Sequence, residues 1–234
     1  MSFNFLLQIE TAPAVADTVT TGVKEIPVWE IINQSNAGIG WIINLLLLFM
    51  FIYVIYVFTE RFLALRRASK EESSFLSKIK GYLISGDLDS AKKLCAATES
   101  PSARMLEKGI ARLGKPLENI SVAIENTAKI EIMRLEQRVS FLATASGAGP
   151  MLGFLGTVVG MVIVFIDLQN VSSLDIQVIA PGIMTSMITT VEGLIVGLVA
   201  FMGYNYLTER IGRIVYTMEN TALEFMDLLN EPGK

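Results

Sequence analysis

The side chains best suited to proton chemistry stand in a long apolar run, from Ile176 to Thr208. Glu192 is the single ionisable residue of that run, and Thr185 and Thr189 fall within about 60° of it on an ideal helix. A carboxyl group near the middle of a bilayer costs about 2.5 to 3.5 kcal/mol even on the mildest insertion scale, so it normally faces a protein interior or a wet path. Glu192 is therefore either a structural acid hydrogen-bonded to threonine or part of a proton or cation pathway.

Two further threonines accompany small residues that repeat at helical spacing. Thr190 lies on a second stripe of the same run, about 100° from the first, together with Gly193 and Gly197. In the preceding uncharged run, Thr157 stands at the edge of a face formed by four glycines, namely Gly149, Gly153, Gly156 and Gly160. Small residues at this spacing let another helix backbone come close in lipid. The pattern is compatible with packing inside one subunit and with contact to another chain.

The residues that are missing exclude several kinds of chemistry. The sequence has no histidine and one cysteine, so it offers no histidine relay, no Ser-His pair, no internal disulfide and no ordinary zinc site. Cys95 lies in a helical pattern and is expected to be a buried packing residue. The glycines lack the following Gly-Lys-Ser/Thr of a phosphate-binding loop. We expect no enzyme, no cofactor, no metal and no nucleic-acid partner.

Three apolar blocks must position these side chains. Hydrophobic residues make up 52% of the chain and charged residues 18%, and the apolar ones are gathered into blocks, as in membrane proteins. Each block is long enough to cross a hydrocarbon core of about 30 Å. The boundaries we predict are an external lead-in at 1–38 with an interfacial helix near Trp29, spans at 39–58, 139–166 and 179–207, a helical domain at 59–138, a loop at 167–178 and a C-terminal helix at 208–234.

The basic residues predict the orientation. Of 19 lysines and arginines, only Lys24, Arg210, Arg213 and Lys234 lie outside the segment 59–138. Cytoplasmic flanks of membrane helices retain positive charge. We therefore expect the N-terminus to lie outside, and the segment 59–138 and the C-terminus to lie in the cytoplasm.

The middle and C-terminal segments read as helices. Asp87 or Asp89 is a candidate N-cap, and Ser100-Pro101 marks a break before the next helix. An apolar stripe leads without interruption into the second span, and another continues beyond the third; their members are Ala128, Ile132, Leu135, Val139 and Leu142, and Leu207, Ile211, Ile214, Met218, Ala222 and Phe225. These stripes must be buried, either against the same chain or against neighbouring subunits. The fold class we predict is an all-α integral membrane protein with three transmembrane helices, the second and third extended into a cytoplasmic bundle.

The lone acid suggests that another chain completes the proton path, and three motifs show a resemblance that agrees. APGIMTSMITTVEGLIVGLVA, GPMLGFLGTVVGM and SGDLDSAKKLCAATESPSARML are similar to segments of the ExbB/TolQ/MotA family of proton-channel motor proteins. The resemblance runs from about Trp41 to about Asn230. Three spans and an external N-terminus resemble ExbB and TolQ rather than four-span MotA.

The resemblance implies a homopentamer in a bacterial inner membrane, with a pore lined by the second and third helices. It also implies an ExbD-like single-span partner whose aspartate carries the proton, and a TonB-like protein that receives the work. Thr157 and Thr190 match the two pore threonines of the family. Where relatives often carry a glutamate, five residues before the second threonine, this chain has Thr185, and its own acid is Glu192, about 160° from Thr190. Glu192 thus faces the pore or lies between subunits.

Three alternatives stay open at this point. A TolQ-like subunit would serve outer-membrane maintenance. A self-sufficient ion channel would conduct without a partner, and a passive scaffold would tolerate apolar residues at Thr157, Thr190 and Glu192.

Overall fold

The computed structural model describes residues 40–69, 74–169 and 176–230, and the predicted lead-in at 1–38 lies outside them. Within these ranges the chain forms helices and short turns, with no strand. The helices are α2 (Gly40–Ala68), α3 (Phe75–Ile84), α4 (Leu88–Ala97), α5 (Pro101–Ile110), α6 (Leu117–Glu136), α7 (Val139–Gln169) and α8 (Ile176–Asn230). An all-α fold is therefore confirmed for the described residues.

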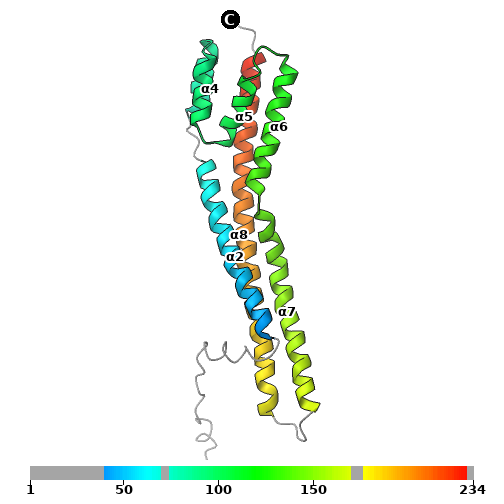
Figure 1. Cartoon of the computed structure of the whole chain (residues 1–234). Helices are drawn as coiled ribbons and strands as arrows, with labels where there is room; N and C mark the ends of the chain where they lie inside the picture. Colours follow the sequence, from blue (N-terminus) through cyan, green and yellow to red (C-terminus); the bar gives the residue numbers. More distant parts are fainter. Residues whose placement is uncertain (1–39, 70–73, 170–175, 231–234) are drawn as a thin grey trace, which may run out of the picture.

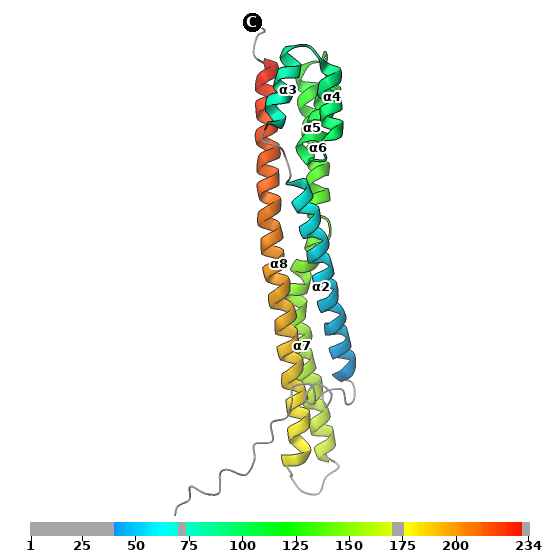
Figure 2. The ribbon, with the colours of Figure 1, turned by 90° about the vertical axis from the view of Figure 1, so that its left-hand side faces the viewer.

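The molecule is a long, narrow rod with two ends of different composition (Figures 1 and 2). At one end α2, α7 and the first part of α8 form what we call the lower bundle. At the other end α3, α4, α5, α6 and the last part of α8 form the upper bundle, and α8 runs through both. Three stretches within the described residues are long and apolar enough to cross a membrane, and the lower bundle contains all three apolar segments. The expected three spans are confirmed in this sense.

The outer surface of the lower bundle is apolar. Large side chains that would be unfavourable in water are exposed there on all three helices, among them Leu45, Phe49, Phe154, Leu194 and Phe201. A contiguous apolar surface of this extent indicates lipid or another protein as its surroundings.

Two helices of the upper bundle, α4 and α5, begin at side-chain caps. Asp87 is the N-cap of α4, and its Oδ1 accepts a hydrogen bond from the Ser90 amide at 3.0 Å, whereas Asp89 lies in the first turn. The Ser100 hydroxyl accepts from the Ala103 amide at 3.1 Å in front of Pro101, the first residue of α5. These bonds satisfy amide groups that have no partner inside the helix. The structure selects Asp87 of the two predicted caps and confirms the break at Ser100-Pro101.

The apolar stripe beyond the third span is buried within its own chain. Leu207, Met218 and Phe225 of α8 are at most 1% exposed and pack in one core with the residues Phe75, Ile79, Leu106, Ile110 and Ile124. Each such side chain contributes about 1.5 to 3 kcal/mol when it leaves water. Cys95 belongs to the same core, as expected, and burial raises the pKa of its thiol to about 12.

We predicted one continuous helix leading into the second span, and this prediction is wrong between α6 and α7. The helix breaks after Glu136 in a turn, where Gln137 has φ of −52° and ψ of 132° and Arg138 has φ of 64°. A left-handed residue with a side chain costs about 1 to 2 kcal/mol, so other contacts must hold it. Arg138 donates to the Glu60 carboxylate of α2 at 2.7 Å, and Arg61 donates to the Arg134 carbonyl at 3.3 Å. That carbonyl belongs to the last turn of α6, where helical partners are missing.

The connection between α7 and α8 is shorter than the predicted loop at 167–178. Helix α7 continues to Gln169 and α8 begins at Ile176, so both predicted loop ends lie within helices. The sequence prediction placed the loop where Asp167 and Asp175 flank polar residues, but charges at a helix end can be hydrated without ending the helix.

Candidate functional site

The glycine face of α7 meets α8 of the same chain. An alanine Cβ at position 153 would lie 2.9 Å from the Thr189 carbonyl oxygen and 3.0 Å from the Thr190 Cα, and one at position 149 would lie 2.8 Å from the Gly193 carbonyl oxygen. These are backbone atoms, so no side-chain rotation could relieve the contact. The two helices touch along their main chains at these positions.

Glycines of α8 complete the same contact from the other side. A Cβ at Gly193 would lie 2.5 Å from the Gly149 carbonyl oxygen and 2.8 Å from the Gly153 Cα. A Cβ at Gly197 would lie 3.0 Å from the Ser146 carbonyl, which Pro150 deprives of its usual amide partner because proline has no N–H. At the other end of the contact, Gly156 and Gly160 make room for the side chains of Thr189 and Ser186 respectively. We call this contact, from Gly149 to Gly160 and from Ser186 to Gly197, the glycine seam.

Hydroxyl groups lie along the glycine seam. The Thr190 hydroxyl donates to the Gly153 carbonyl of α7 at 3.2 Å. Thr157, one turn further along α7, donates to its own Phe154 carbonyl at 2.6 Å and is partly exposed. A helical carbonyl points toward the residue four positions ahead, so the Thr190 hydroxyl lies beside the peptide of Thr157. The structure thus brings the two threonines to the same turn of α7.

These bonds determine what the two hydroxyls can offer to a third group. A hydroxyl has one hydrogen to donate and two lone pairs to accept with. Because both hydrogens already go to backbone carbonyls, the free capacity of both oxygens is for accepting. An acceptor surface in a dry environment favours a protonated carboxyl group or a hydrated proton over a carboxylate.

Glu192 lies elsewhere, on the side of α8 that faces α2. It lines a cavity of about 680 Å³ whose other walls are apolar residues of both helices together with one amide, namely Trp41, Asn44, Leu45, Leu47, Leu48, Phe51, Ile195 and Val196. Thr190, in contrast, bonds to α7. The Glu192 carboxyl group and the Thr190 hydroxyl therefore occupy different faces of α8.

Thr185, Thr189 and Glu192 share a helix face in projection but do not form one cluster. Thr189 is 1% exposed, donates to the Ser186 carbonyl at 2.8 Å and packs on Gly156. Thr185 is half-buried two turns before Glu192. Thr189 and Glu192 are separated by about 60° around the axis of α8. This angle is large enough for Thr189 to face α7 while Glu192 faces the cavity beside α2.

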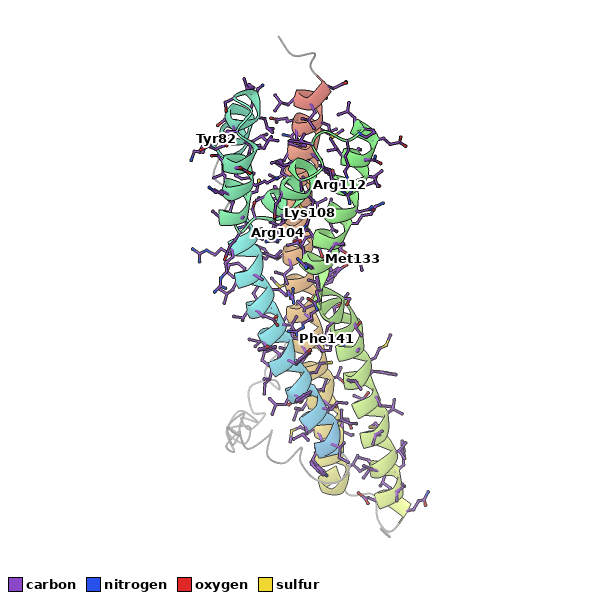
Figure 3. The ribbon with its side chains drawn as sticks, turned by 45° about the horizontal axis from the view of Figure 1, so that its top comes forward. Tyr82, Arg104, Lys108, Arg112, Met133 and Phe141 are labelled. Atoms are coloured by element: carbon purple, nitrogen blue, oxygen red, sulfur yellow. The ribbon has the colours of Figure 1, made fainter. Side chains whose placement is uncertain are left out.

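A charged cluster joins α5 to α6 within the upper bundle, and sequence reasoning did not find it. Glu131 is 3% exposed and receives Arg104 at 2.6 Å and Arg134 at 2.8 Å. Arg104 lies where the upper end of α2 meets α5 (Figure 3). The spacing of Glu131 and Arg134 fits a helical pair, but 27 residues separate Glu131 from Arg104, and only the fold brings them together.

No group of three or more Cys, Asp or Glu side chains with metal-binding geometry occurs in the part of the chain that the structure describes. The site thus consists of hydroxyls along two touching helices and one carboxyl group beside a third.

These features define a class first: an all-α membrane protein whose second and third spans touch along a seam of glycines and threonines. The chain belongs to the MotA/TolQ/ExbB proton channel family, whose model matches residues 97–220. The match covers α5, α6 and α7 and most of α8, and therefore the whole seam. It confirms the resemblance stated above.

Individual relatives carry two different names. A Tol-Pal system protein TolQ of Haemophilus influenzae is 38% identical over 100 residues, which cover 43% of this chain and 44% of the relative. A biopolymer transport protein ExbB of Salmonella typhimurium is 30% identical over 104 residues, covering 40% of this chain and 43% of the relative. The aligned part is thus somewhat less than half the length of these relatives.

Proposed function

We propose that this chain is a proton-channel subunit of a motor in a bacterial inner membrane. Five copies surround a pore, and an ExbD-like partner with a single span stands inside it. Proton flow through the complex drives TonB-dependent transport at the outer membrane. The observation that carries the proposal is the pair of hydroxyls, Thr157 and Thr190, on one turn of the glycine seam, inside the region matched by a proton channel family.

The chemistry of the seam suits an acid that alternates between charged and neutral states. The partner's carboxyl group, once protonated, donates to the Thr157 or Thr190 oxygen, whose lone pairs are free. When the partner's carboxyl group loses its proton, the two hydroxyl oxygens can no longer accept a hydrogen bond from it. The resulting carboxylate is then more stable in another position or in contact with water. One charge that crosses 100 mV releases about 2.3 kcal/mol, several times the thermal energy.

Rigidity of the seam is part of this proposal. Contacts between backbones leave α7 and α8 little freedom to slide, because interdigitated main chains cannot rotate away as side chains can. The two helices therefore act as one wall, and the motion belongs to the partner inside the pore.

Glu192 has a separate role in the proposal. It faces α2 and not the seam, so it does not meet the partner's acid in the same position as the threonines. We place Glu192 as a single acid in a mostly apolar cavity between α2 and α8, and we assign the direct contact with the moving proton to Thr157 and Thr190.

The orientation follows from the charges. The segment 59–138, which holds most of the basic residues, forms the greater part of the upper bundle, at the opposite end of the rod from the connection between α7 and α8. We therefore place the upper bundle and the C-terminus in the cytoplasm and that connection in the periplasm.

Threonine-to-valine variants test the proposal, since valine keeps the shape and removes the hydroxyl. Cells that lack their own ExbB and TolQ proteins would receive this chain together with its single-span partner, and growth on an iron-siderophore complex would be measured. We expect Thr157→Val and Thr190→Val to assemble with the partner but to lose most of the growth. Thr144→Val is the matched control, because Thr144 lies on α7 outside the seam and bonds only to its own helix. Full growth of both seam variants would contradict the proposal.

A Tol-type output is the second candidate, because two of the relatives are named TolQ. The same cells distinguish the two outputs. Restored resistance to detergents and bile salts without siderophore-dependent growth would assign the chain to outer-membrane maintenance. The reverse result would assign it to nutrient import.

A further inference from the structure

A second cavity lies between α2 and α8 on the side of the upper bundle, and the proposed proton path does not use it. It has a volume of about 400 Å³, and its walls are Phe62, Leu65, Arg66 and Ser69 of the α2 end and Tyr206, Leu207, Arg210 and Ile214 of α8. Figure 2 shows these two helices running alongside each other through this region. One wall is thus apolar and aromatic, and two guanidinium groups stand at the rim.

The cavity is at the depth of lipid headgroups. On α2 the uncharged run ends at Phe58, and on α8 it ends at Thr208, so both helices leave the hydrocarbon here. The Tyr206 ring lies 6.3 Å from the Phe58 ring and 6.0 Å from the Phe62 ring, which places an aromatic cluster at the boundary. Tyrosine is enriched at this level because its ring is apolar and its hydroxyl is wet.

Helix geometry directs both arginines back toward the bilayer. Helical side chains tilt toward the N-terminus of their own helix. Helices α2 and α8 both run from the lower part of the rod toward the upper bundle (Figure 1). The side chains of Arg66 and Arg210 are therefore expected to lean toward the membrane surface. Arginine can cover that distance because its apolar stem packs on neighbouring side chains while its charge stays in the polar layer.

Among the described residues that line the cavity none is acidic, so none of these wall residues neutralises the two guanidinium groups. Among the described residues neither Arg66 nor Arg210 forms an ion pair with a carboxylate. The nearby carboxylate of Glu209 is held by Arg213 instead. Arg210 stacks on the Tyr206 ring, with its Cζ 5.5 Å from the ring centre, and its Nε donates to the Tyr206 hydroxyl at 3.2 Å. Its position is thereby fixed while its other N–H groups remain free to bind.

We propose that this cavity binds one anionic phospholipid of the cytoplasmic leaflet. Arg66 and Arg210 hold the phosphate by charge-assisted hydrogen bonds, and Phe62, Leu65 and Tyr206 pack against the glycerol and the upper part of the acyl chains. The assignment to a leaflet uses the proposed orientation, but binding of the lipid does not depend on proton transport. The bound lipid adds a further link between α2 and α8, whose Phe62 and Tyr206 rings lie 6.0 Å apart beside the cavity.

Lipid binding to the purified full-length chain in a neutral detergent tests this. Native mass spectrometry would count the bound lipid while dioctanoyl phosphatidylglycerol is titrated, with dioctanoyl phosphatidylcholine and inorganic phosphate as parallel probes. We expect the glycerol lipid to bind at least tenfold more tightly than the choline lipid. Each arginine near an anionic lipid surface is worth about fivefold in affinity, so the double variant Arg66→Gln/Arg210→Gln is expected to lose about 25-fold.

The matched control is the double variant Arg67→Gln/Lys92→Gln, which removes the same charge at two exposed positions outside the cavity. It is expected to stay within threefold of the wild type. An equal loss in both double variants would reduce the effect to general attraction and overturn the proposal. Inorganic phosphate that competes as well as the lipid would overturn it too, because the apolar wall would then contribute nothing. If the first double variant fails to assemble, the single variants Arg66→Gln and Arg210→Gln decide, with a loss of about fivefold expected for each.

Discussion

Adding one methyl group to the glycine seam should separate α7 from α8 and weaken the hydroxyl pair at the same time. In Gly153→Ala the new Cβ would lie 2.9 Å from the Thr189 carbonyl oxygen and 3.0 Å from the Thr190 Cα. Carbon atoms in unstrained contact stand about 3.5 Å or more from their neighbours, so the helices must part by about 0.5 Å. The Thr190 hydroxyl, now 3.2 Å from the Gly153 carbonyl, would move to a distance at which the hydrogen bond is lost.

Two opposing effects determine the size of the change. Alanine is a better helix former than glycine by about 1 kcal/mol, which stabilises the variant. Overpacking against a backbone costs about 1 to 3 kcal/mol, and the lost hydrogen bond costs about 1 kcal/mol more. The net expectation is a loss of about 1 to 3 kcal/mol in the free energy of unfolding. Unfolding in mixed micelles with increasing SDS, followed by circular dichroism, would measure it.

Gly147→Ala is the control for this experiment. Gly147 is on α7, less than two turns before Gly153, and a Cβ there would meet no atom within 4 Å. Only the helix-propensity gain then operates, so the variant should be as stable as the wild type or more stable. If Gly153→Ala matched Gly147→Ala in stability, the backbone contact inferred for the seam would be refuted.

Two further predictions concern the upper bundle. Cys95 has a thiol pKa of about 12 because burial disfavours the thiolate and Glu107 adds repulsion, so the folded chain should resist iodoacetamide at pH 8 and react once unfolded. Because folding raises the pKa of Cys95, its thiol contributes fully to the stability of the fold below the unfolded pKa of about 9, and this contribution is lost as the pH rises from there toward 12. Rapid alkylation of the folded protein at pH 8 would contradict the prediction of a buried thiol. Glu131→Gln removes the acceptor of Arg104 and Arg134 and should lower stability by about 1 to 3 kcal/mol in thermal unfolding, whereas Glu125→Gln, at an exposed pair, should leave it unchanged. Equal melting temperatures for the two glutamine variants would show that the Glu131 cluster is not stabilising.

Local patterns in the sequence predicted the elements well, because each of those patterns acts over a few residues. Asp87 and Ser100 precede helices, and their side chains reach amides only three positions ahead. The spacing from Leu207 to Phe225 follows the helix period, so the buried face of α8 could be read directly. The break at Arg138 could not be read, since the ion pair with Glu60 that holds it joins residues 78 positions apart.

The candidate site divides in the same way. That Thr157, Thr190 and the glycines lie on helix faces follows from their spacing, and that they sit in apolar spans follows from composition. Which helix each face meets could not follow, because a projection around one helix axis carries no information about its neighbours. Thr190 turned out to bond to α7, and Glu192 to line a cavity beside α2.

By itself the sequence determined the class, the three apolar spans, the family resemblance and the lack of histidine and of a second cysteine, because composition and short-range periodicity suffice for these. The tertiary structure alone decided that α7 and α8 touch backbone to backbone, that Thr190 bonds to α7 while Glu192 lines a cavity beside α2, and that Arg66 and Arg210 line one cavity. Such pairings depend on contacts between residues far apart in the chain. They exist only when packing has selected one arrangement among the many that the same amphipathic helices would allow.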